Sequence, residues 1–397
     1  MIEQTNTPKL RFPEFKNEWS YDLLSDVVTN KSKKFDPKKE EATKDIELDS
    51  IEQNTGRLLD TYISNDFTSQ KNKFKKGNVL YSKLRPYLNK YYYAIIDGVC
   101  SSEIWVLNTL NKDVLVNKFL YYFIQTNRFS SVTNKSAGSK MPRADWELVK
   151  NIRLYKGSIK EQEKIGYFFS KLDRHIELEE EKLELLEQQK KGYMQKIFSQ
   201  ELRFKDENGN SYPDWSIKKI EDISKVNKGF TPNTKNDKYW DELNENWLSI
   251  AGMTQKYLYK GNKGITEKGA SKHVKVDKDT LIMSFKLTLG KLAIVKEPIY
   301  TNEAICHFVW KESNVNTEYM YYYLNSINIS TFGAQAVKGV TLNNDAINSI
   351  IVKLPVIQEQ NKIAYFFNKL DKLIEKQSSK VELLKQRKQG FLQKMFV

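Results

Sequence analysis

The sequence predicts an α+β protein with two similar globular α/β modules, separated by two long α-helices that pair as an antiparallel coiled coil. The stretch Glu161–Phe198 returns 198 residues later as Glu359–Phe396, with 22 of 38 positions identical and no gap. Both stretches carry apolar residues at heptad spacing. The segments before them contain short runs rich in Val, Ile, Tyr and Trp, which are typical of strands. Since so long a period is not that of a solenoid, half of the chain is duplicated, which gives a pseudo-twofold internal repeat.

The elements of the first module can be predicted in chain order. The mixed-charge stretch 31–44 is expected to be a solvated loop or a tail of the fold, and 116–129 has the apolar spacing of a helix. A polar loop is expected at 134–140, before a short helix near 143–149. Strands are expected at 78–84, 91–96, 103–107 and 152–155.

The second module repeats this order with less identity. Leu202-Arg203-Phe204 echoes Leu10-Arg11-Phe12, and Trp215 echoes Trp19. Strands are expected at 280–284 and 351–354, and a helix at 315–325. Because the globular parts have diverged while the helices have not, we interpret the repeat as one frame that presents two specificities; drift in surface loops is the alternative. The predicted domains are 1–157, 158–200, 201–356 and 357–397.

The two long helices are expected to pack through their apolar seams. The seam consists of Ile165, Phe169, Leu172, Ile176, Leu183 and Leu186 in the first helix, and of Ile363, Phe367, Leu370, Ile374, Val381 and Leu384 in the second. Glu179 and Lys190 interrupt the first seam at the places where Gln377 and Lys388 interrupt the second. Two head-to-tail units are most simply related by a twofold axis, which favours the antiparallel arrangement and would bring the end of the second helix beside Leu10-Arg11-Phe12.

The composition points to a polyanionic partner. The formal net charge is +14 and the pI about 9.3, an excess that most often means nucleic acid, although a merely basic soluble protein is the alternative. The two cysteines and three histidines have no zinc-type spacing, so no metal site is expected. Cys306 and His307 are expected in the core. No run approaches 18 apolar residues, so we expect a soluble, cytoplasmic protein.

No catalytic signature is visible in the sequence. There is no phosphate-binding G-x-x-x-x-G-K-[ST] loop, no Gly-rich dinucleotide turn, and no Ser/His/Asp or Cys/His arrangement. We therefore predict a binding protein with no catalytic residues. The acidic run between Glu177 and Glu187 is expected to be a solvated face, with a docking surface for a basic partner as the alternative.

Several basic loops have a composition suited to DNA. Arg can read guanine, while Lys, hydroxyls and backbone N–H groups hold phosphate. The candidate DNA-binding residues of these loops are Lys83, Arg85, Tyr87, Asn89, Lys90, Ser139, Lys140 and Arg143 in the first module, and Lys286, Lys291, Lys338 and Thr341 in the second.

Three further features form a pattern: Gly77–Pro86, the Gly-Phe-Thr-Pro motif at Gly229–Pro232 followed by Trp240 and Trp247, and the duplicated helix starts at Ile159 and Ile357, each leading to Lys-Leu-Asp. In these features the chain resembles the specificity (S) subunits of type I restriction-modification systems, and the resemblance covers nearly its whole length. Thr231 in this motif and Asn233 after it join the candidate DNA-binding residues. The first helix start departs from the family pattern, because Tyr155-Lys156-Gly157 stands where the second has Leu354-Pro355.

This resemblance implies a division of labour. Each module would be a target-recognition domain for one half of a split DNA sequence, and the helix pair would fix the unread spacer. The chain would bind no cofactor. Two methyltransferase (M) subunits with S-adenosylmethionine would dock on the helices, and two restriction (R) subunits with ATP and Mg would complete the complex. The alternatives are a stand-alone DNA-binding or regulatory protein with a coiled-coil ruler, and a coiled-coil adaptor without a nucleic-acid role.

Overall fold

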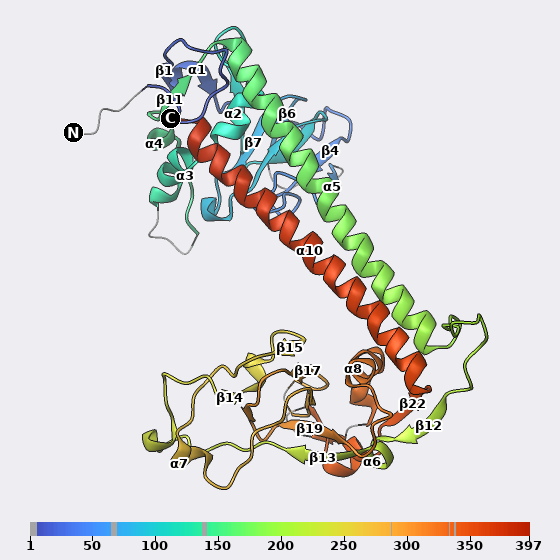
Figure 1. Ribbon diagram of the computed structural model, residues 1–397. Helices are drawn as coiled ribbons and strands as arrows, with labels where there is room; N and C mark the ends of the chain where they lie inside the picture. The colour runs from blue at the N-terminus through green and yellow to red at the C-terminus, as the bar shows by residue number, and fades with distance from the viewer. Residues whose placement is uncertain (1–5, 65–69, 137–140, 287, 333, 337–338) are drawn as a thin grey trace. The chain divides into compact units, whose positions relative to one another are not determined.

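The computed structural model describes residues 6–64, 70–136, 141–286, 288–332, 334–336 and 339–397. The chain forms two compact units (Figure 1). Unit 1 combines Met1–Glu181 with Ser378–Val397, and unit 2 is Lys182–Gln377. The sequence-based division into four domains stays a prediction. Within the described ranges, no helix is both long enough and apolar enough to cross a membrane.

Two long helices contribute to both units. They are α5 (Ile159–Phe198) and α10 (Ile357–Met395), and they start at equivalent positions of the repeat, so the departure at Gly157 does not shift the helix start. Every predicted seam residue is buried or partly buried. Those that are fully buried are Ile165, Phe169, Ile176, Ile363, Phe367, Val381 and Leu384.

In unit 1 the early part of α5 packs on the late part of α10. The Phe168 and Phe391 ring centroids are 5.3 Å apart, and Lys388 Nζ lies 2.7 Å from Asp173 Oδ1. As the residue numbers rise along α5, those of the partners fall along α10. The two segments are therefore antiparallel, as the twofold argument predicted.

Unit 2 contains the complementary segments with the same antiparallel pairing. Lys190 Nζ lies 2.6 Å from Asp371 Oδ1, and the Tyr193 and Phe366 rings meet edge to face at 5.1 Å. Lys190 and Lys388, which interrupt the heptads, are thus each paired with the aspartate of a Lys-Leu-Asp motif. Such paired polar groups within an apolar seam favour one register over others.

The globular part of unit 1 contains two sheets and a two-stranded ribbon. The ribbon is β1 (Ser20–Leu23) with β11 (Arg153–Lys156), antiparallel. One sheet has the order β2-β10-β7-β8: β2 (Val28–Thr29), β10 (Ile104–Thr109), β7 (Val79–Ser82) and β8 (Tyr91–Tyr93). The other has the order β3-β6-β9-β4-β5: β3 (Lys34–Phe35), β6 (Lys71–Phe74), β9 (Gly98–Ser101), β4 (Lys44–Ile46) and β5 (Tyr62–Ile63). The helices are α1 (Leu24–Val27), α2 (Asn117–Phe123), α3 (Asn127–Thr133) and α4 (Trp146–Val149).

The main core of unit 1 is aromatic and is completed by α10. Phe119 of α2 and Phe169 of α5 are fully buried, and both rings contact Phe396, with centroids 4.9 and 6.1 Å apart. Leu392 and Met395 belong to the same cluster. The residues around position 395 are therefore an integral part of the first module, as Figure 1 shows where the end of α10 lies beside α2.

The sequence prediction for unit 1 was wrong at two points. One helix was expected over 116–129, but α2 and α3 are separate. The backbone of Thr126 is extended (φ −81°, ψ 156°), and its Oγ1 donates a hydrogen bond to the Phe123 carbonyl at 2.7 Å. The stretch 31–44 was expected to be only a loop, but it contains β3, in which Lys34 pairs with Asn72 of β6. Its mixed charge concealed a short edge strand.

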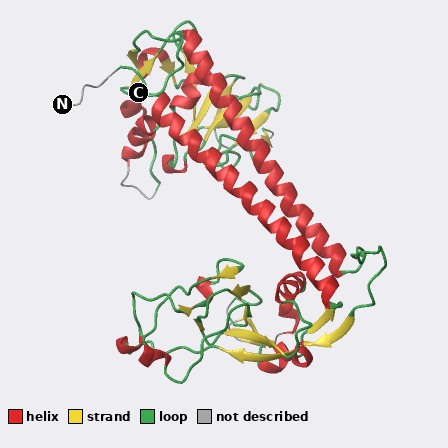
Figure 2. Ribbon diagram, in the orientation of Figure 1, coloured by secondary structure: helices red, strands yellow, loops and turns green. Residues whose placement is uncertain are grey.

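Unit 2 has a different sheet arrangement. The ribbon is β12 (Ser216–Lys219) with β22 (Ile351–Leu354). The main sheet has the order β13-β19-β16-β17-β15: β13 (Ser224–Lys228), β19 (Ile305–Trp310), β16 (Leu281–Ser284), β17 (Leu292–Val295) and β15 (Tyr257–Leu258). Two small pairs are β14 (Trp247–Leu248) with β18 (Tyr300–Thr301), and β20 (Ala334–Ala336) with β21 (Gly339–Thr341). The helices are α6 (Ile220–Ile223), α7 (Glu267–Ala270), α8 (Thr317–Ser326) and α9 (Asn344–Asn348). Long loops join these short elements (Figure 2).

The core of unit 2 repeats the main core of unit 1. Phe367 of α10 is fully buried and stacks on Phe198 of α5, with centroids 5.8 Å apart. Tyr322 of α8 contacts Phe367, just as Tyr122 of α2 contacts Phe169. The repeat therefore extends from the helices into the parts of each module that touch them.

The predicted position of the Leu-Arg-Phe segments is confirmed. In unit 1, the Leu10 N–H donates to the Lys394 carbonyl of α10 (2.8 Å). In unit 2, the Leu202 N–H donates to the Lys196 carbonyl of α5 (3.0 Å). The Leu202 segment follows directly after α5 in the sequence, whereas the Leu10 segment is far in sequence from α10. Both nevertheless make the same backbone hydrogen bond to the helix end.

Candidate functional site

The start of each long helix carries a buried carboxylate that is fully paired. In unit 1, both Glu161 oxygens accept from Arg11, through Nε at 2.6 Å and Nη2 at 2.8 Å, and the Trp19 indole N–H donates to Oε2 at 3.1 Å. Gly157 allows this approach, because a Cβ there would lie 2.0 Å from Glu161 Oε2. In unit 2, Arg203 and Trp215 donate to Glu359 in the same way.

The glutamine after this carboxylate attaches the helix to the globular part. Gln162 Oε1 accepts from the Val116 N–H (3.0 Å), and its amide donates to the Val114 and Gly157 carbonyls. Gln360 makes the matching bonds, accepting from the Asn316 N–H at 2.8 Å. The repeated Glu-Gln pair is thus structural: it fixes each globular part on its helix pair.

A Tyr–Asp–Lys contact joins three elements in each unit. The Tyr122 hydroxyl of α2 donates to Asp173 of α5 (2.9 Å), whose other oxygen meets Lys388 of α10. In unit 2, Tyr322 donates to Asp371, which also meets Lys190. The aspartate of Lys-Leu-Asp therefore connects the module, its own helix and the opposite helix.

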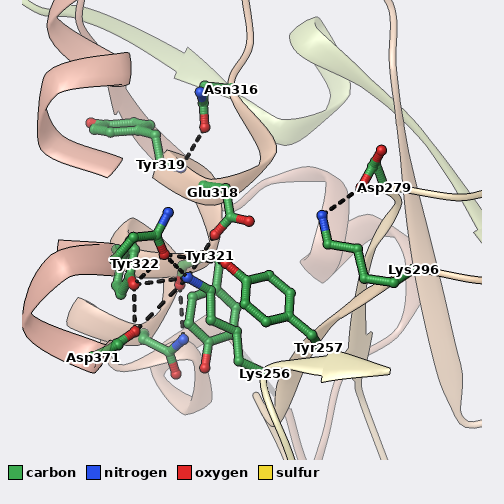
Figure 3. A network of polar contacts seen from close by, with 12 residues as sticks. Lys256, Tyr257, Asp279, Lys296, Asn316, Glu318, Tyr319, Tyr321, Tyr322 and Asp371 are labelled. Atoms are coloured by element: carbon green, nitrogen blue, oxygen red, sulfur yellow. Dashed lines mark hydrogen bonds and ion pairs between the residues drawn. The ribbon is translucent and has the colours of Figure 1, made fainter. Parts of the chain in front are cut away.

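Unit 2 adds a lysine to this contact (Figure 3). Lys256, just before β15, places Nζ 2.6 Å from Glu318 Oε2 and 2.7 Å from the Tyr322 hydroxyl, and 4.2 Å from the Tyr322 ring centroid. Burial lowers the pKa of Lys256, an effect opposed by Glu318. This network attaches the edge of the main sheet to α8 and α10. Sequence reasoning missed it, since nothing local distinguishes Lys256 from other lysines.

The candidate DNA-binding loops of unit 1 come together. The Arg85 N–H donates to the Pro142 carbonyl (2.8 Å), and residues 84 and 143 form a β-bridge. Lys83 is partly buried, Arg85 is exposed and Tyr87 is 55% exposed. Ser139 and Lys140 lie outside the described residues.

Three other candidates of unit 1 have structural partners. Arg143 Nε donates to Glu103 Oε2 (3.0 Å), Lys90 Nζ donates to a backbone carbonyl (2.5 Å), and the Asn89 amide donates to Asn54 (3.0 Å). Arg85 differs from them, because no side-chain partner is seen for it in the described part of the chain. The backbone is left-handed at both Arg85, at φ 51°, and Asn89, at φ 46°. Strained positions of this kind cluster at functional sites, and Arg85 combines such a backbone with a side chain that is free to reach a ligand, which makes it the strongest candidate of the loop.

The candidates of unit 2 within the described residues are spread over three segments. Thr231 Oγ1 accepts from the Asn302 amide (2.8 Å), and Asn233 Oδ1 accepts from the Lys235 N–H (3.0 Å), so both side chains shape the turn after β13. Lys286 is exposed, and Lys291 is partly buried; they belong to the connection between β16 and β17. Thr341 ends β21, and Lys338 lies outside the described residues.

The acidic run of α5 is largely paired within unit 1. Glu179 lies 2.6 Å from Lys380 Nζ, and Glu180 contacts both Arg57 and Lys385. These carboxylates hold α10 and the 50–58 loop to α5. Among the described residues, no group of three or more His, Cys, Asp or Glu side chains is arranged to hold a metal ion.

Acidification should destabilise unit 2 through His307. The predicted core position is confirmed: His307 is 8% exposed and its Nε2 lies 2.5 Å from Thr301 Oγ1. Burial lowers the pKa of His307 from 6.5 to about 4. The unfolded chain therefore takes up a proton first, so the stability of the neutral buried ring is present above pH 6.5 and is lost as the pH falls toward 4, by roughly 3 kcal/mol in total.

Denaturant unfolding between pH 7 and 4.5, followed by hydrogen exchange in β19, measures this decrease in stability. His307→Gln should flatten the pH dependence, because it removes the titrating group. An equally steep dependence in that variant would assign the acid sensitivity to other groups.

Comparisons with known proteins give a consistent result. The family model described as "Type I restriction modification DNA specificity domain" matches twice, at residues 16–188 and 212–384. The specificity subunit of the type I restriction enzyme MjaIX from Methanocaldococcus jannaschii is 30% identical over 196 residues, which is 47% of this chain and 45% of the relative. The MjaVIII specificity subunit of that organism is 23% identical over 316 residues, or 73% and 72% of the two chains.

A solved chain of a type I R-M system has the same fold. It superposes with a TM-score of 0.66 at 13% sequence identity and covers 97% of this chain and 98% of that chain. The match to the MjaIX subunit spans just under half of that relative's length, whereas the structural likeness spans nearly all of both chains.

Proposed function

Because the chain belongs to the type I restriction modification DNA specificity family, whose domain it carries twice, we propose that it reads a bipartite DNA target for a type I restriction-modification complex. Each unit binds one half-site. The observation that carries the proposal is the contrast within the repeat. The hydrogen-bonded side chains at the start of each long helix are the same in both units, as the Arg11–Glu161 and Arg203–Glu359 pairs show. The sheets of the two modules, in contrast, differ in strand number and order.

A protein that recognises two different half-sites requires this contrast. A common frame ensures that both modules are held to the helices in the same way, and different loops allow each to recognise a different sequence. Base readout needs side chains on loops or helices that reach a groove, while phosphate contacts position them. Lys83 and Arg85 in unit 1 and Lys286 in unit 2 are exposed or partly exposed on such loops.

Charge reversal in the first loop tests its role in DNA binding. Arg85→Glu is expected to weaken binding of a target duplex by the complex about tenfold or more, since a good arginine–base contact contributes about 1–3 kcal/mol. Lys83→Glu should weaken binding to all sequences and reduce the salt dependence, because one lysine fewer then neutralises the DNA phosphates. The readout is duplex affinity at several salt concentrations.

Lys150→Glu provides a control with the same change in charge and should leave the affinity unchanged, because Lys150 is paired with Glu147 and is not a candidate DNA-binding residue. If Arg85→Glu leaves the affinity unchanged at moderate salt, residues 83–90 do not belong to the DNA interface.

The partners are two methyltransferase subunits that dock on the long helices. Tyr167 of α5 and Tyr365 of α10 occupy equivalent positions of the repeat and are 63% and 62% exposed. In both copies a lysine one turn later lies over the ring, Lys171 at 5.2 Å and Lys369 at 4.6 Å. A large aromatic side chain exposed at the same place in both units supports one kind of partner bound twice.

The chain itself contributes recognition and docking, and no chemistry. The partner subunits bind S-adenosylmethionine, ATP and Mg. The methyltransferase subunits methylate adenine, and the restriction subunits, where two are present, cleave DNA. We expect the complex in the cytoplasm, where it meets its DNA target.

Methylation mapping of cells with and without this chain tests the proposal. Loss of adenine methylation at one bipartite sequence is the expected result. Purification of the tagged chain should also recover a methyltransferase subunit at two copies per chain. If the chain binds duplex DNA but recovers no methyltransferase, it is a stand-alone DNA-binding protein instead.

A further inference from the structure

A lysine-lined pocket in unit 2 lies beside the Gly-Phe-Thr-Pro motif, and none of its lysines is among the candidates that the sequence indicated. Its volume is about 410 Å³, and it is formed by the end of β13, the 272–277 loop, and parts of β18 and β19. Lys228, Lys272 and Lys275 contribute to its wall. The volume is within the range of small-molecule and cofactor sites, so the pocket has room for a nucleotide-sized group.

The charge of this pocket is strongly one-sided. Within the described residues no ion pair is seen for Lys228, Lys272 or Lys275, and Asp277 is the one carboxylate of the wall. Lys228 Nζ lies 4.5 Å from the centroid of the Phe285 ring and Lys275 Nζ lies 5.7 Å from that of Tyr300. Some other lysines of unit 2 have carboxylate partners, such as Lys260 with Glu245 and Lys296 with Asp279. All three pocket lysines are exposed, so a bound anion can approach them and would offset their mutual repulsion.

The remaining wall is neutral and includes a flat surface. Thr301 and His307 line it, but both are buried and bonded to each other, and the lowered pKa of His307 keeps that ring neutral at ordinary pH. The His273 ring lies flat on Phe230, with centroids 3.5 Å apart and planes 2° apart. A planar pair of rings beside lysines suits the sugar or base that adjoins a phosphate.

The pocket is held in shape from the strand side. Gly229 packs so tightly that a Cβ would lie 2.1 Å from the Thr301 carbonyl oxygen, and the Phe230 N–H donates to that oxygen (2.8 Å). Lys272 has a left-handed backbone, at φ 73°. The Gly-Phe-Thr-Pro motif therefore forms one wall of the pocket, which gives this motif a role that its own side chains did not reveal.

We propose that this pocket binds a phosphodiester of the DNA backbone at the second half-site, with Lys228, Lys272 and Lys275 as its cationic ligands and the Phe230–His273 pair against the neighbouring nucleotide. The inference rests on the proposed function and adds to it the place where unit 2 holds its DNA. It also gives the bonds of Thr231 and Asn233 within the turn a role, because the turn shapes the pocket whose lysines bind the phosphate.

The test compares two double variants in the complex of the full chain with its methyltransferase subunits. Lys272→Gln with Lys275→Gln is expected to weaken binding of the target duplex at least tenfold, and to lower the slope of log affinity against log salt by about 0.9 for each phosphate that the pocket no longer neutralises. Lys260→Gln with Lys296→Gln makes the same change in net charge at paired lysines and should leave both quantities unchanged. Lys272→Arg with Lys275→Arg should retain binding.

The outcomes separate this inference from the function on which it rests. If the unmodified complex binds no bipartite duplex, the proposed function fails. If it does bind, and the pocket variant keeps its affinity and salt slope, the pocket assignment fails alone. A change in which sequence is methylated, in place of a uniform decrease in affinity, would also overturn the assignment, because it would show base reading and not phosphate binding.

Discussion

Replacing Glu161 with alanine is expected to lower the free energy of unfolding of unit 1 by about 3–5 kcal/mol, because it leaves a buried guanidinium without its carboxylate. Arg11 is 12% exposed and Glu161 1% exposed in their side chains, and the Trp19 indole N–H loses its acceptor as well. The destabilisation should appear as faster hydrogen exchange at the start of α5 and in β1. Since the chain has two units, site-resolved exchange is more informative than a single unfolding curve.

Two variants control this experiment. Glu163→Ala changes an exposed glutamate of the same helix and should alter stability by less than about 0.5 kcal/mol. Arg11→Leu combined with Glu161→Leu removes both charges and should recover part of the stability, because no unpaired buried charge remains. A Glu161→Ala effect below about 1 kcal/mol would mean that water replaces the carboxylate without difficulty, contrary to the burial of this node.

Phe169→Ala is expected to destabilise unit 1 by about 3–5 kcal/mol, the usual cost of truncating a fully buried phenylalanine. The ring is 0% exposed and stacks with Tyr122 at a centroid distance of 5.0 Å, and it also contacts Phe396. Its removal opens a cavity between α2 and both long helices. Chemical denaturation with hydrogen exchange in α2 measures the effect.

Tyr167→Ala, two residues earlier on the same helix, is the matched comparison. Tyr167 is 63% exposed, so its truncation should change stability little but weaken recovery of the methyltransferase subunit. The two variants are thus expected to separate folding from assembly. If Tyr167→Ala is as destabilising as Phe169→Ala, or if it leaves the partner bound as before, the exposed tyrosines are not a docking site.

The parts of the fold that the sequence predicted are those encoded locally. Ile165 and Phe169 follow the heptad, and the duplication shows it twice, so the helices and their antiparallel pairing could be inferred. The break between α2 and α3 was missed, because the apolar spacing continues across Thr126, while the polar contact at the break is a single hydroxyl bonded to the Phe123 carbonyl. A single polar residue within a long run of helical apolar spacing is not enough to predict a helix break from the sequence.

The candidate site was predicted less completely, because its residues come from distant parts of the chain. Arg11 and Glu161 are both visible as repeated residues, but nothing in the sequence shows that they meet. The loop at Arg85 was predicted from its charge, whereas its left-handed backbone and its contact with Pro142 appear only in three dimensions. Lys272 and Lys275 were missed because lysines in a loop without arginine resemble ordinary surface charges.

The divided composition of unit 1 has a consequence for how the protein is made. Unit 1 draws its first 181 residues from the beginning of the chain and residues 378–397 from far downstream, and unit 2 is synthesised between them. On a ribosome, unit 2 can therefore complete its fold while the first module still waits for Leu392, Met395 and Phe396. During that interval Phe119 and Phe169 have no Phe396 ring to pack against. The incomplete first module therefore exposes apolar surface and is prone to aggregation.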